Sequence, residues 1–272
     1  MIRRAARRAI PAPIRLRIRL ARRRLRDARR RVRFAERRSD RAGFRHSWGK
    51  YERPFIDYPG QEHLGAAKRR NQAILAAYLH GVVVSPGETF SVWRLAPRPA
   101  SNLGYGEAAA LHGTTLTTDV GGAICLLATV LYNAGILAGL EVTERHCHVV
   151  DNYGEARYFE LGRDAAIEFG YQDLRFRNPH AVALRLSMTV TGCVVSAEFS
   201  GPCPAPFSVD VEVYGPRTEP GAGAGDGQSW SPWRHPSPAP SVTLRTVQTL
   251  RYGDGSRVTR DLGQTTHLAP RP

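Results

Sequence analysis

The sequence predicts an α+β protein: two core helices, then a run of mostly antiparallel strands, with a basic helical arm at the N-terminus. Two segments, residues 64–81 and 124–138, carry apolar residues at helical spacing or in an uncharged run. After residue 140 the apolar period changes to two, which is typical of strands. Because 42% of the 272 residues are hydrophobic, the chain can bury a substantial core.

The N-terminal arm carries the whole net charge of the chain. Residues 1–41 contain eighteen arginines against Asp27, Glu36 and Asp40, which accounts for the formal charge of +15. The remaining chain is neutral, and it has no nucleic-acid recognition motif. We therefore expect no specific nucleic-acid partner.

A basic amphipathic helix is predicted within the arm. Its apolar residues follow a four-three spacing, at Ile14, Ile18, Ala21, Leu25, Ala28, Val32 and Ala35. Such a helix suits an anionic membrane surface. The candidate membrane-binding residues are Arg15, Arg22, Arg23, Arg24, Arg29, Arg30 and Arg31. A solvated tail and a nonspecific nucleic-acid arm are the alternatives.

The expected compartment is the cytoplasm, with the protein peripheral at the inner face of the membrane. The arm has no uninterrupted apolar stretch of the kind found in a Sec or Tat signal. Four cysteines in this length fit free thiols, although one bridge between Cys193 and Cys203 stays open. Residues 120–140 are uncharged, but their glycines and Asn133 favour a buried helix over a membrane span.

The elements follow one another along the chain. Residues 51–60 are expected to be irregular, and the helix over 64–81 to stop at Gly81. Residues 82–95 read as a strand, a turn at Pro86-Gly87 and a second extended piece, and residues 100–111 as turn-rich. The uncharged helix then runs from about Ile124 to Ala138.

The second half is predicted to be rich in strands. Strand-like runs cover residues 140–150, 164–171, 173–178, 181–190, 193–201 and 207–215, and a tight hairpin is expected at Thr191-Gly192. The predicted division is an arm over residues 1–45, an α+β domain over 46–215, a Gly/Pro/Ser-rich linker over 216–240 and a β-hairpin segment over 241–272.

Cys125 is the candidate nucleophile, because it stands in the first turn of the uncharged helix. Unpaired N–H groups and the helix dipole at this position favour a thiolate. Gly121 and Gly122 would let a substrate approach the backbone. The alternative is a small apolar side chain in a buried core helix.

Histidines for a base lie in the segment ERHCHVV. On a strand, His146 and His148 would share one face while Cys147 pointed to the other. The orienting carboxylate could be Asp151, Asp164 or Glu144, and Cys125 with His148 and Asp164 is a sensible Cys-His-acid set. A zinc site built from His146, His148 and Cys125 is weakly indicated, so neither a metal nor another cofactor is expected.

Several segments together resemble the VanW family. They are SPGETFSVWRL, GYGEA, VGGAIC, LYNAGILAGLEVTERHCH and GRDAAIEFGYQDLRFRN, from about Asn71 to Gly201. The resemblance implies a link to the cell envelope and to glycopeptide resistance, with no reaction assigned. It directs attention to Cys125, His148 and Asp164, and to Gly121, Gly122, Glu88, Glu144, Arg145, His146 and Arg163 as binding residues.

This chain departs from the family pattern Gly-Gly-Gly-x-Cys-Gln with a serine soon after. The corresponding positions are Ala123, Leu126 and Ala128. Loss of the glutamine removes a possible oxyanion donor. The sequence therefore favours a noncatalytic envelope accessory module, with a Cys-His enzyme acting on peptidoglycan peptides or precursors as the alternative. The expected partners are an anionic membrane surface and a cell-wall peptide or precursor.

Overall fold

The α+β fold is confirmed by the computed structural model, which describes residues 11–57, 62–112, 115–150, 157–219 and 241–268. The helices are α2 (Ala12–Arg29), α3 (Gly65–Leu79), α4 (Val92–Leu95) and α5 (Cys125–Leu137), with short 3-10 turns η1 (Glu62–Leu64) and η2 (Ser101–Leu103). The two predicted core helices are α3 and α5. No helix of these described ranges is long and apolar enough to cross a membrane.

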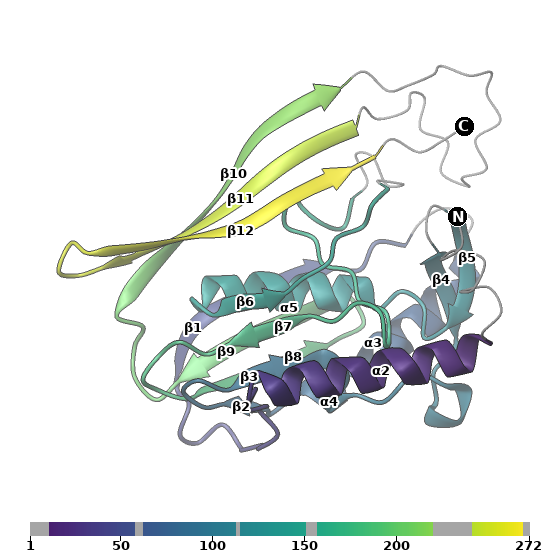
Figure 1. Cartoon of the computed structure of the whole chain (residues 1–272), viewed down its shortest axis with the longest axis horizontal. Helices are drawn as coiled ribbons and strands as arrows, with labels where there is room; N and C mark the ends of the chain where they lie inside the picture. Colours follow the sequence, from purple (N-terminus) through teal and green to yellow (C-terminus); the bar gives the residue numbers. More distant parts are fainter. Residues whose placement is uncertain (1–10, 58–61, 113–114, 151–156, 220–240, 269–272) are drawn as a thin grey trace.

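The strands form four antiparallel sheets (Figure 1). The largest has the order β1-β9-β8-β2, made of β1 (His46–Pro54), β9 (Val194–Gly201), β8 (Leu184–Val190) and β2 (Val83–Val84). The second is β3 (Thr89–Ser91), β7 (Arg175–Arg177) and β6 (Glu141–Glu144). A hairpin joins β4 (Glu107–His112) to β5 (Thr115–Val120), and the last sheet contains β10 (Phe207–Glu219), β11 (Ser241–Tyr252) and β12 (Arg257–His267).

Helix α5 is the buried centre of the fold. Every residue from Leu126 to Ile136 is buried, as expected for an uncharged helix with apolar side chains on all faces. Small residues let its neighbours approach closely: a Cβ on Gly49 of β1 would lie 2.3 Å from the backbone nitrogen of Ala138. On another side, the ring of Phe176 in β7 occupies the space beside Gly135. The helix is thus held between two sheets.

Helix α3 packs against β8 and stops where the sequence predicts. Gly81 adopts a left-handed conformation with φ of 80°, which glycine tolerates without a steric penalty. Two polar residues on the helix, Asn71 and Gln72, are fully buried. Because a buried amide needs partners, they indicate that α3 holds a neighbouring segment as well as filling the core.

The C-terminal sheet β10-β11-β12 extends away from the rest of the chain in Figure 1, and its inner side contacts the body. The buried Gln248 side chain donates to the Ile136 carbonyl of α5 at 2.6 Å. Thr246 donates to the Gly162 carbonyl at 2.8 Å. The predicted terminal hairpin is therefore confirmed as β11 and β12, and the hairpin at Thr191-Gly192 as the β8–β9 connection. Most of the predicted linker, residues 220–240, lies outside the described residues.

Only part of the predicted arm helix is helical. Helix α2 ends at Arg29, and Arg31 takes a positive φ of 52° in the turn that follows. Val32 and Ala35 were predicted to continue the apolar stripe, but they lie beyond the helix, and Ala35 is buried at 1% exposure. Residues just after the turn join the body, since Phe34 forms a β-bridge with Thr89.

Three local predictions are wrong. Tyr51 to Pro54 were expected to be irregular but belong to β1, where they pair with β9. The predicted extended piece after Pro86-Gly87 becomes helical at Val92, because the Ser91 hydroxyl accepts the Arg94 N–H and caps a turn. The hairpin β4–β5 was not predicted, since residues 100–111 read as turn-rich.

The predicted strand over residues 164–171 is also wrong. Its backbone groups bond to α5 and to the segment after β6, in place of a strand ladder. The Ala165 N–H donates to the Thr129 hydroxyl at 3.0 Å, and the Ala166 N–H donates to the His146 carbonyl at 2.8 Å. These bonds fix Asp164 beside the start of α5.

Candidate functional site

Cys125 is the first residue of α5 and follows a tightly constrained turn. Gly121 has φ of 81°, and a Cβ on Gly122 would lie 2.1 Å from the Ala108 carbonyl oxygen, so neither position accepts a side chain. Ala123 nevertheless takes a left-handed φ of 64°. The turn directs the chain from strand β5 into α5 with Cys125 at the open end of the helix.

Helix α3 holds this turn in place. The Asn71 amide donates to the carbonyls of Gly106 and Gly122 at 2.9 and 3.0 Å and accepts the Gly106 N–H at 2.8 Å. The Gln72 amide donates to the Ala123 carbonyl at 2.8 Å. The buried polar pair of α3 therefore sets the position of the backbone leading into Cys125.

A polar stripe on α5 binds the segment around Arg163 and Ala165, on the opposite side of the site. Cys125, Thr129 and Asn133 are spaced four residues apart and lie on one face of an otherwise apolar helix. Thr129 donates to the Ala165 carbonyl at 3.2 Å, and the Asn133 amide donates to the Arg163 carbonyl at 2.9 Å. These bonds hold residues 163–165 beside the helix that begins with Cys125.

His148 and Asp164 form a buried pair next to Cys125. Asp164 Oδ2 accepts both the backbone N–H of His148 at 2.8 Å and its Nδ1–H at 3.1 Å. The Tyr158 hydroxyl lies 3.4 Å from Nε2 of the same imidazole, and the Cys125 thiol, which lies 4.0 Å from the Ile167 carbonyl oxygen, lines the same cavity as His148. The three predicted residues are thus brought together as a Cys-His-Asp constellation.

The charges of His148 and Asp164 stabilise each other. Burial alone would lower the pKa of His148, but hydrogen bonds and charge from Asp164 and Cys125 raise it to about 10. Burial would raise the pKa of Asp164, but the hydrogen bond and charge of His148, with Arg145 and His267, lower it.

Asp164 is also held from its other side by Arg145 and His267. Arg145 donates to the Asp164 carbonyl at 2.8 Å and to its Oδ1 at 3.3 Å, with its guanidinium 4.6 Å from the centre of the Tyr132 ring. His267 Nε2 lies 3.6 Å from Oδ1. The Phe159 ring stacks between His148 and His267, with centroid distances of 6.0 and 5.7 Å.

His267 is the residue that sequence reasoning missed. It is 2% exposed and comes from the end of β12, more than a hundred residues after Asp164. A histidine at the end of a terminal strand carries no local signal for such a role, since only the packing of the C-terminal sheet on the body brings it there. Thr265 of the same strand accepts a hydrogen bond from Arg145 at 3.1 Å.

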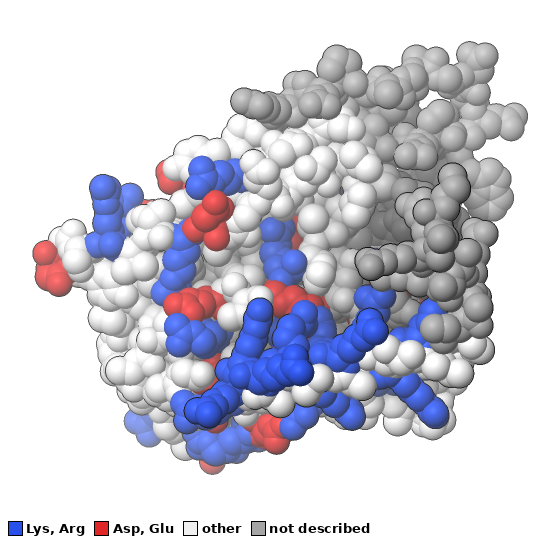
Figure 2. Space-filling model, in the orientation of Figure 1, with Lys and Arg blue, Asp and Glu red and all other residues white. Residues whose placement is uncertain are grey.

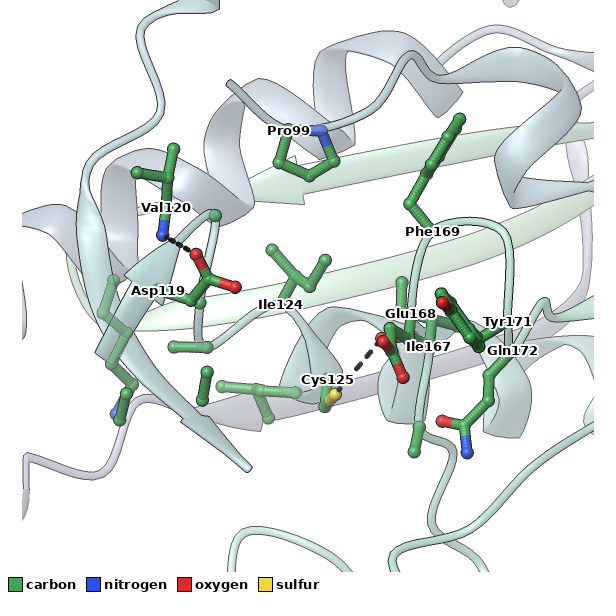
Figure 3. A pocket seen from close by; sticks show the side chains of 18 of the residues that line it. Pro99, Asp119, Val120, Ile124, Cys125, Ile167, Glu168, Phe169, Tyr171 and Gln172 are labelled. Carbon is green, nitrogen blue, oxygen red and sulfur yellow. Dashed lines mark hydrogen bonds between the residues drawn. The ribbon is translucent and has the colours of Figure 1, made fainter. Parts of the chain in front are cut away.

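A cavity of about 800 Å³ opens above Cys125. In Figure 3 the sulfur lies between the Asp119–Val120 end of β5 and the segment that carries Phe169 and Tyr171. Gly121, Gly122, Leu126, Cys147 and His148 also line the cavity. Among the described residues, no acceptor bonds the N–H groups of Cys125 and Leu126, so they are available to a ligand oxygen.

His146 does not share this cavity with His148, so the predicted common face is wrong. Strand β6 ends at Glu144 with an irregular register, and the alternation of side chains ends with it. The His146 Nε2 lies 3.1 Å from Glu144 Oε1 instead. The tentative zinc set of Cys125, His146 and His148 is therefore not brought together.

The other binding candidates have contacts outside the cavity. Glu144 pairs with Arg23 of α2 and accepts the Asp173 N–H at 3.1 Å. Arg163 donates to the Asn133 side chain at 2.7 Å and to Glu160 at 3.0 Å. Glu88 accepts the Ser85 N–H at 2.9 Å within the Pro86-Gly87 turn. The alternative acid Asp151 lies outside the described residues.

Fold and site together define an α+β protein with a Cys-His-Asp constellation at the start of a buried helix. Comparison with known sequences identifies the protein family. The model of the family described as VanW like protein matches residues 67–200, and the chain belongs to this family through that segment. The segment contains Cys125, His148 and Asp164, whereas α2 and His267 lie outside it.

Two curated relatives match the same part of the chain. It is 34% identical over 109 residues to the vancomycin B-type resistance protein VanW of Enterococcus faecalis (strain ATCC 700802 / V583), covering 40% of each protein. It is 32% identical over 114 residues to the uncharacterized protein YoaR of Bacillus subtilis (strain 168), covering 42% of this chain and 36% of that protein. The match thus spans about two fifths of these relatives or less. No solved structure matches the chain.

Proposed function

We propose that this protein is a cysteine-dependent acyl-transfer or hydrolase enzyme that acts on a cell-wall peptide or precursor. The observation that carries the proposal is that Cys125, at the start of α5, lines one cavity together with His148, whose Nδ1–H is held by the buried Asp164. A nucleophile, a base and an orienting acid in this arrangement are the parts of a thiol acyl-transfer site. The printed name of the Enterococcus faecalis relative refers to vancomycin resistance, and the cell-wall substrate is our inference from that link.

The first half of the reaction forms a thioester. The Cys125 thiolate attacks a substrate carbonyl carbon, and the C–S bond forms as the carbonyl electrons move onto oxygen. The N–H groups of Cys125 and Leu126 at the start of α5 would stabilise this oxyanion. When the intermediate collapses, the bond to the leaving amine or alcohol breaks, and His148 gives its proton to that group.

The second half restores the enzyme. Neutral His148 removes a proton from water or an acceptor amine, which attacks the thioester carbonyl. The C–S bond then breaks, leaving the acid or the transferred product and the Cys125 thiolate beside a protonated His148. Asp164 keeps the Nδ1–H of the imidazole directed at itself throughout, so that Nε2 faces the reaction.

Because residue 126 is a leucine, the donors to the oxyanion must come from the backbone. Leu126 lines the cavity at the position where the family pattern has glutamine, and its side chain cannot donate a hydrogen bond. The backbone N–H groups at the helix end remain. Ala128, at the family's serine position, is fully buried and does not line the cavity, so that change leaves the reacting groups unaltered.

Alkylation kinetics test the enzyme proposal. A variant with Cys147→Ser, Cys193→Ser and Cys203→Ser retains only Cys125, and its iodoacetamide rate is measured against pH. We expect a rate already near its maximum at about pH 7, lost in the His148→Ala version of the same variant. A thiol that reacts only near about pH 9, like an ordinary cysteine, would contradict the proposal.

A second candidate, a noncatalytic accessory module docked at the inner membrane surface, is favoured by a different observation. Three large apolar side chains of α2 are exposed to solvent, namely Ile14, Ile18 and Leu25 at 47%, 39% and 53%. Their stripe is flanked by arginines, which is the pattern of an interfacial helix. This docking does not depend on catalysis and is compatible with it.

Vesicle binding tests the docking. Deleting the arm to Arg41 would also remove the buried Ala35, so substitutions on the exposed stripe are the cleaner variant. Replacing Ile14, Ile18 and Leu25 by glutamate should abolish binding to phosphatidylglycerol vesicles while the fold is retained. Unchanged binding of this variant would sink the docking proposal.

A further inference from the structure

Helix α2 presents one face to the body and the opposite face to solvent. Leu16, Leu20, Arg23 and Asp27 follow one helical stripe and are the partly buried residues of the helix. Leu16 and Leu20 pack against Gly170, where a Cβ would lie 2.3 Å from Leu16. Arg19, at the edge of this face, lies 4.2 Å from the Tyr171 ring centre.

Buried charges fix the helix on the body. Arg23 pairs with Glu144 and, at 3.4 Å, with Asp173, whose carboxylate is fully buried. Asp27 pairs with Arg175 at 3.0 Å, and both side chains are largely buried. Because several of these partners are shared, the contacts form a network in which the loss of one leaves another buried charge unpaired. The orientation of α2 relative to the cavity is therefore defined.

The exposed stripe lies half a helical turn away from the buried face. Each residue of this stripe precedes a body-facing residue by two positions, which is a rotation of about 200° around the helix axis. The stripe consists of Ile14, Ile18, Ala21 and Leu25. Figure 2 shows Lys and Arg side chains gathered along this part of the surface. The exposed arginines of the helix are Arg15, Arg17, Arg19, Arg22, Arg24, Arg26 and Arg29. An apolar stripe with cations on both flanks complements an anionic bilayer.

The first turn of the same helix forms part of the wall above Cys125. Ala12, Pro13 and Leu16 line the cavity together with Cys125 and His148. The cavity lining is itself amphiphilic: Leu16, Trp93 and Phe169 contribute apolar surface, and Lys68, Asp119 and Glu168 contribute charge. One helix thus faces the cavity on one side and carries the membrane-binding stripe on the other.

We propose that the cavity opens beside the lipid surface and takes an amphiphilic substrate that stays anchored in the bilayer while its acyl or peptidyl carbonyl reaches Cys125. This inference rests on the proposed function and names its substrate class. The apolar part of the lining accommodates the part of the substrate that leaves the lipid. The charged part accommodates a polar headgroup.

A pair of maleimide probes tests the inference in the full chain that retains Cys125 as its sole cysteine. One probe is a phospholipid with a maleimide headgroup, incorporated into phosphatidylglycerol vesicles, and the other is soluble N-ethylmaleimide. We expect the lipid probe to label Cys125 about tenfold faster or more than it labels the variant with glutamate at positions 14, 18 and 25. The soluble probe should label both proteins at the same rate, because the three substituted side chains are exposed and do not line the cavity.

A sole-cysteine version with Cys203 is the positional control. Cys203 is exposed and does not line the cavity, so the soluble probe should label it readily and the lipid probe should not. Failure of the lipid probe to label Cys125 while the soluble probe reacts and the vesicles bind would overturn this inference and leave the enzyme proposal standing. Failure of both probes would overturn both proposals. Labelling of Cys203 as fast as Cys125 by the lipid probe would also overturn the inference.

Discussion

Ala123 shows at the scale of one residue how this chain differs from the family pattern it resembles. A third glycine is usual at this position, and the left-handed φ of 64° explains the preference, since such a conformation costs a non-glycine residue about 1 kcal/mol or more. The chain retains the conformation because Gln72 holds the Ala123 carbonyl and Ala109 accepts its N–H.

Replacing Ala123 by glycine should therefore stabilise the protein. The relief of strain exceeds the added entropy of the unfolded chain, for a net gain of about 0.5–1 kcal/mol. Urea denaturation measures it. The matched control is Ala128→Gly, within α5 and not at positive φ, which should destabilise by about 1 kcal/mol or more. A loss of stability with Ala123→Gly would contradict the strain account.

His267 makes a second prediction at the residue scale, as a positioning residue for Asp164. His267→Phe retains stacking on Phe159 but removes the nitrogen that faces the carboxylate. We expect the alkylation rate of Cys125 at neutral pH to fall severalfold with little loss of stability. Thr266→Ala, on the same strand but exposed and with its hydroxyl 3.0 Å from that of Thr243, should leave the rate unchanged. Equal rates in all three proteins would remove His267 from the site.

At the scale of elements, α2 depends on charges that respond to acid. Burial would raise the pKa of Glu144, but hydrogen bonds and charge from His146 and Arg23 lower it to about 2. A carboxylate whose pKa is lower in the folded than in the unfolded protein stabilises the folded state at pH values above its unfolded pKa, which is about 4.3. That stabilisation is lost as the pH falls through the folded pKa of about 2. The seating of α2 should therefore weaken progressively between about pH 4.5 and pH 2.

Hydrogen exchange of the α2 amides measures this weakening, after correction for the intrinsic pH dependence of exchange. Glu144→Gln should reduce protection of α2 already at neutral pH and remove the further acid response. Glu141→Gln is the matched control on the same strand, because its pair with Arg177 is partly exposed and contributes little. Unchanged α2 protection in Glu144→Gln would show that the charge network does not hold the helix.

The same scale shows what could be predicted from the sequence. Helix α3 and the terminal hairpin follow from periodicity, because each buries a face that its own residues define, and α5 follows from its uncharged run. The segment 164–171 alternates like a strand, but its N–H groups bond to Thr129 and to the His146 carbonyl, partners that no local pattern specifies. The hairpin β4–β5 was missed because Gly104 and Gly106 give the segment before β4 a turn composition, and the alanines of β4 are weak strand formers.

Only the part of the candidate site that lies between Cys125 and Asp164 was predictable from the sequence. Cys125 at a helix start, with His148 and Asp164 nearby in sequence, follows from residue chemistry and spacing. His267 depends on how the C-terminal sheet packs, and the separation of His146 from His148 depends on where β6 ends. Local sequence therefore specified the candidate residues Cys125, His148 and Asp164, whereas tertiary packing determined the contacts that support them.

At the scale of the whole molecule, three regions of the chain meet at one cavity. The family segment supplies Cys125, His148 and Asp164, the N-terminal helix supplies part of the cavity wall, and the C-terminal sheet supports Asp164 through His267. Both outer regions lie beyond the segment matched by the family model. The account therefore predicts that the site functions only in the assembled chain.

The most direct test of the central claim, that His148 activates Cys125 as a nucleophile, is the ultraviolet thiolate absorbance of the sole-cysteine protein as a function of pH. The account predicts that this absorbance is already present at about pH 6 and disappears in the Cys125→Ser and His148→Ala variants. An absorbance that appears only above about pH 8.5, equally with and without His148, would contradict the account.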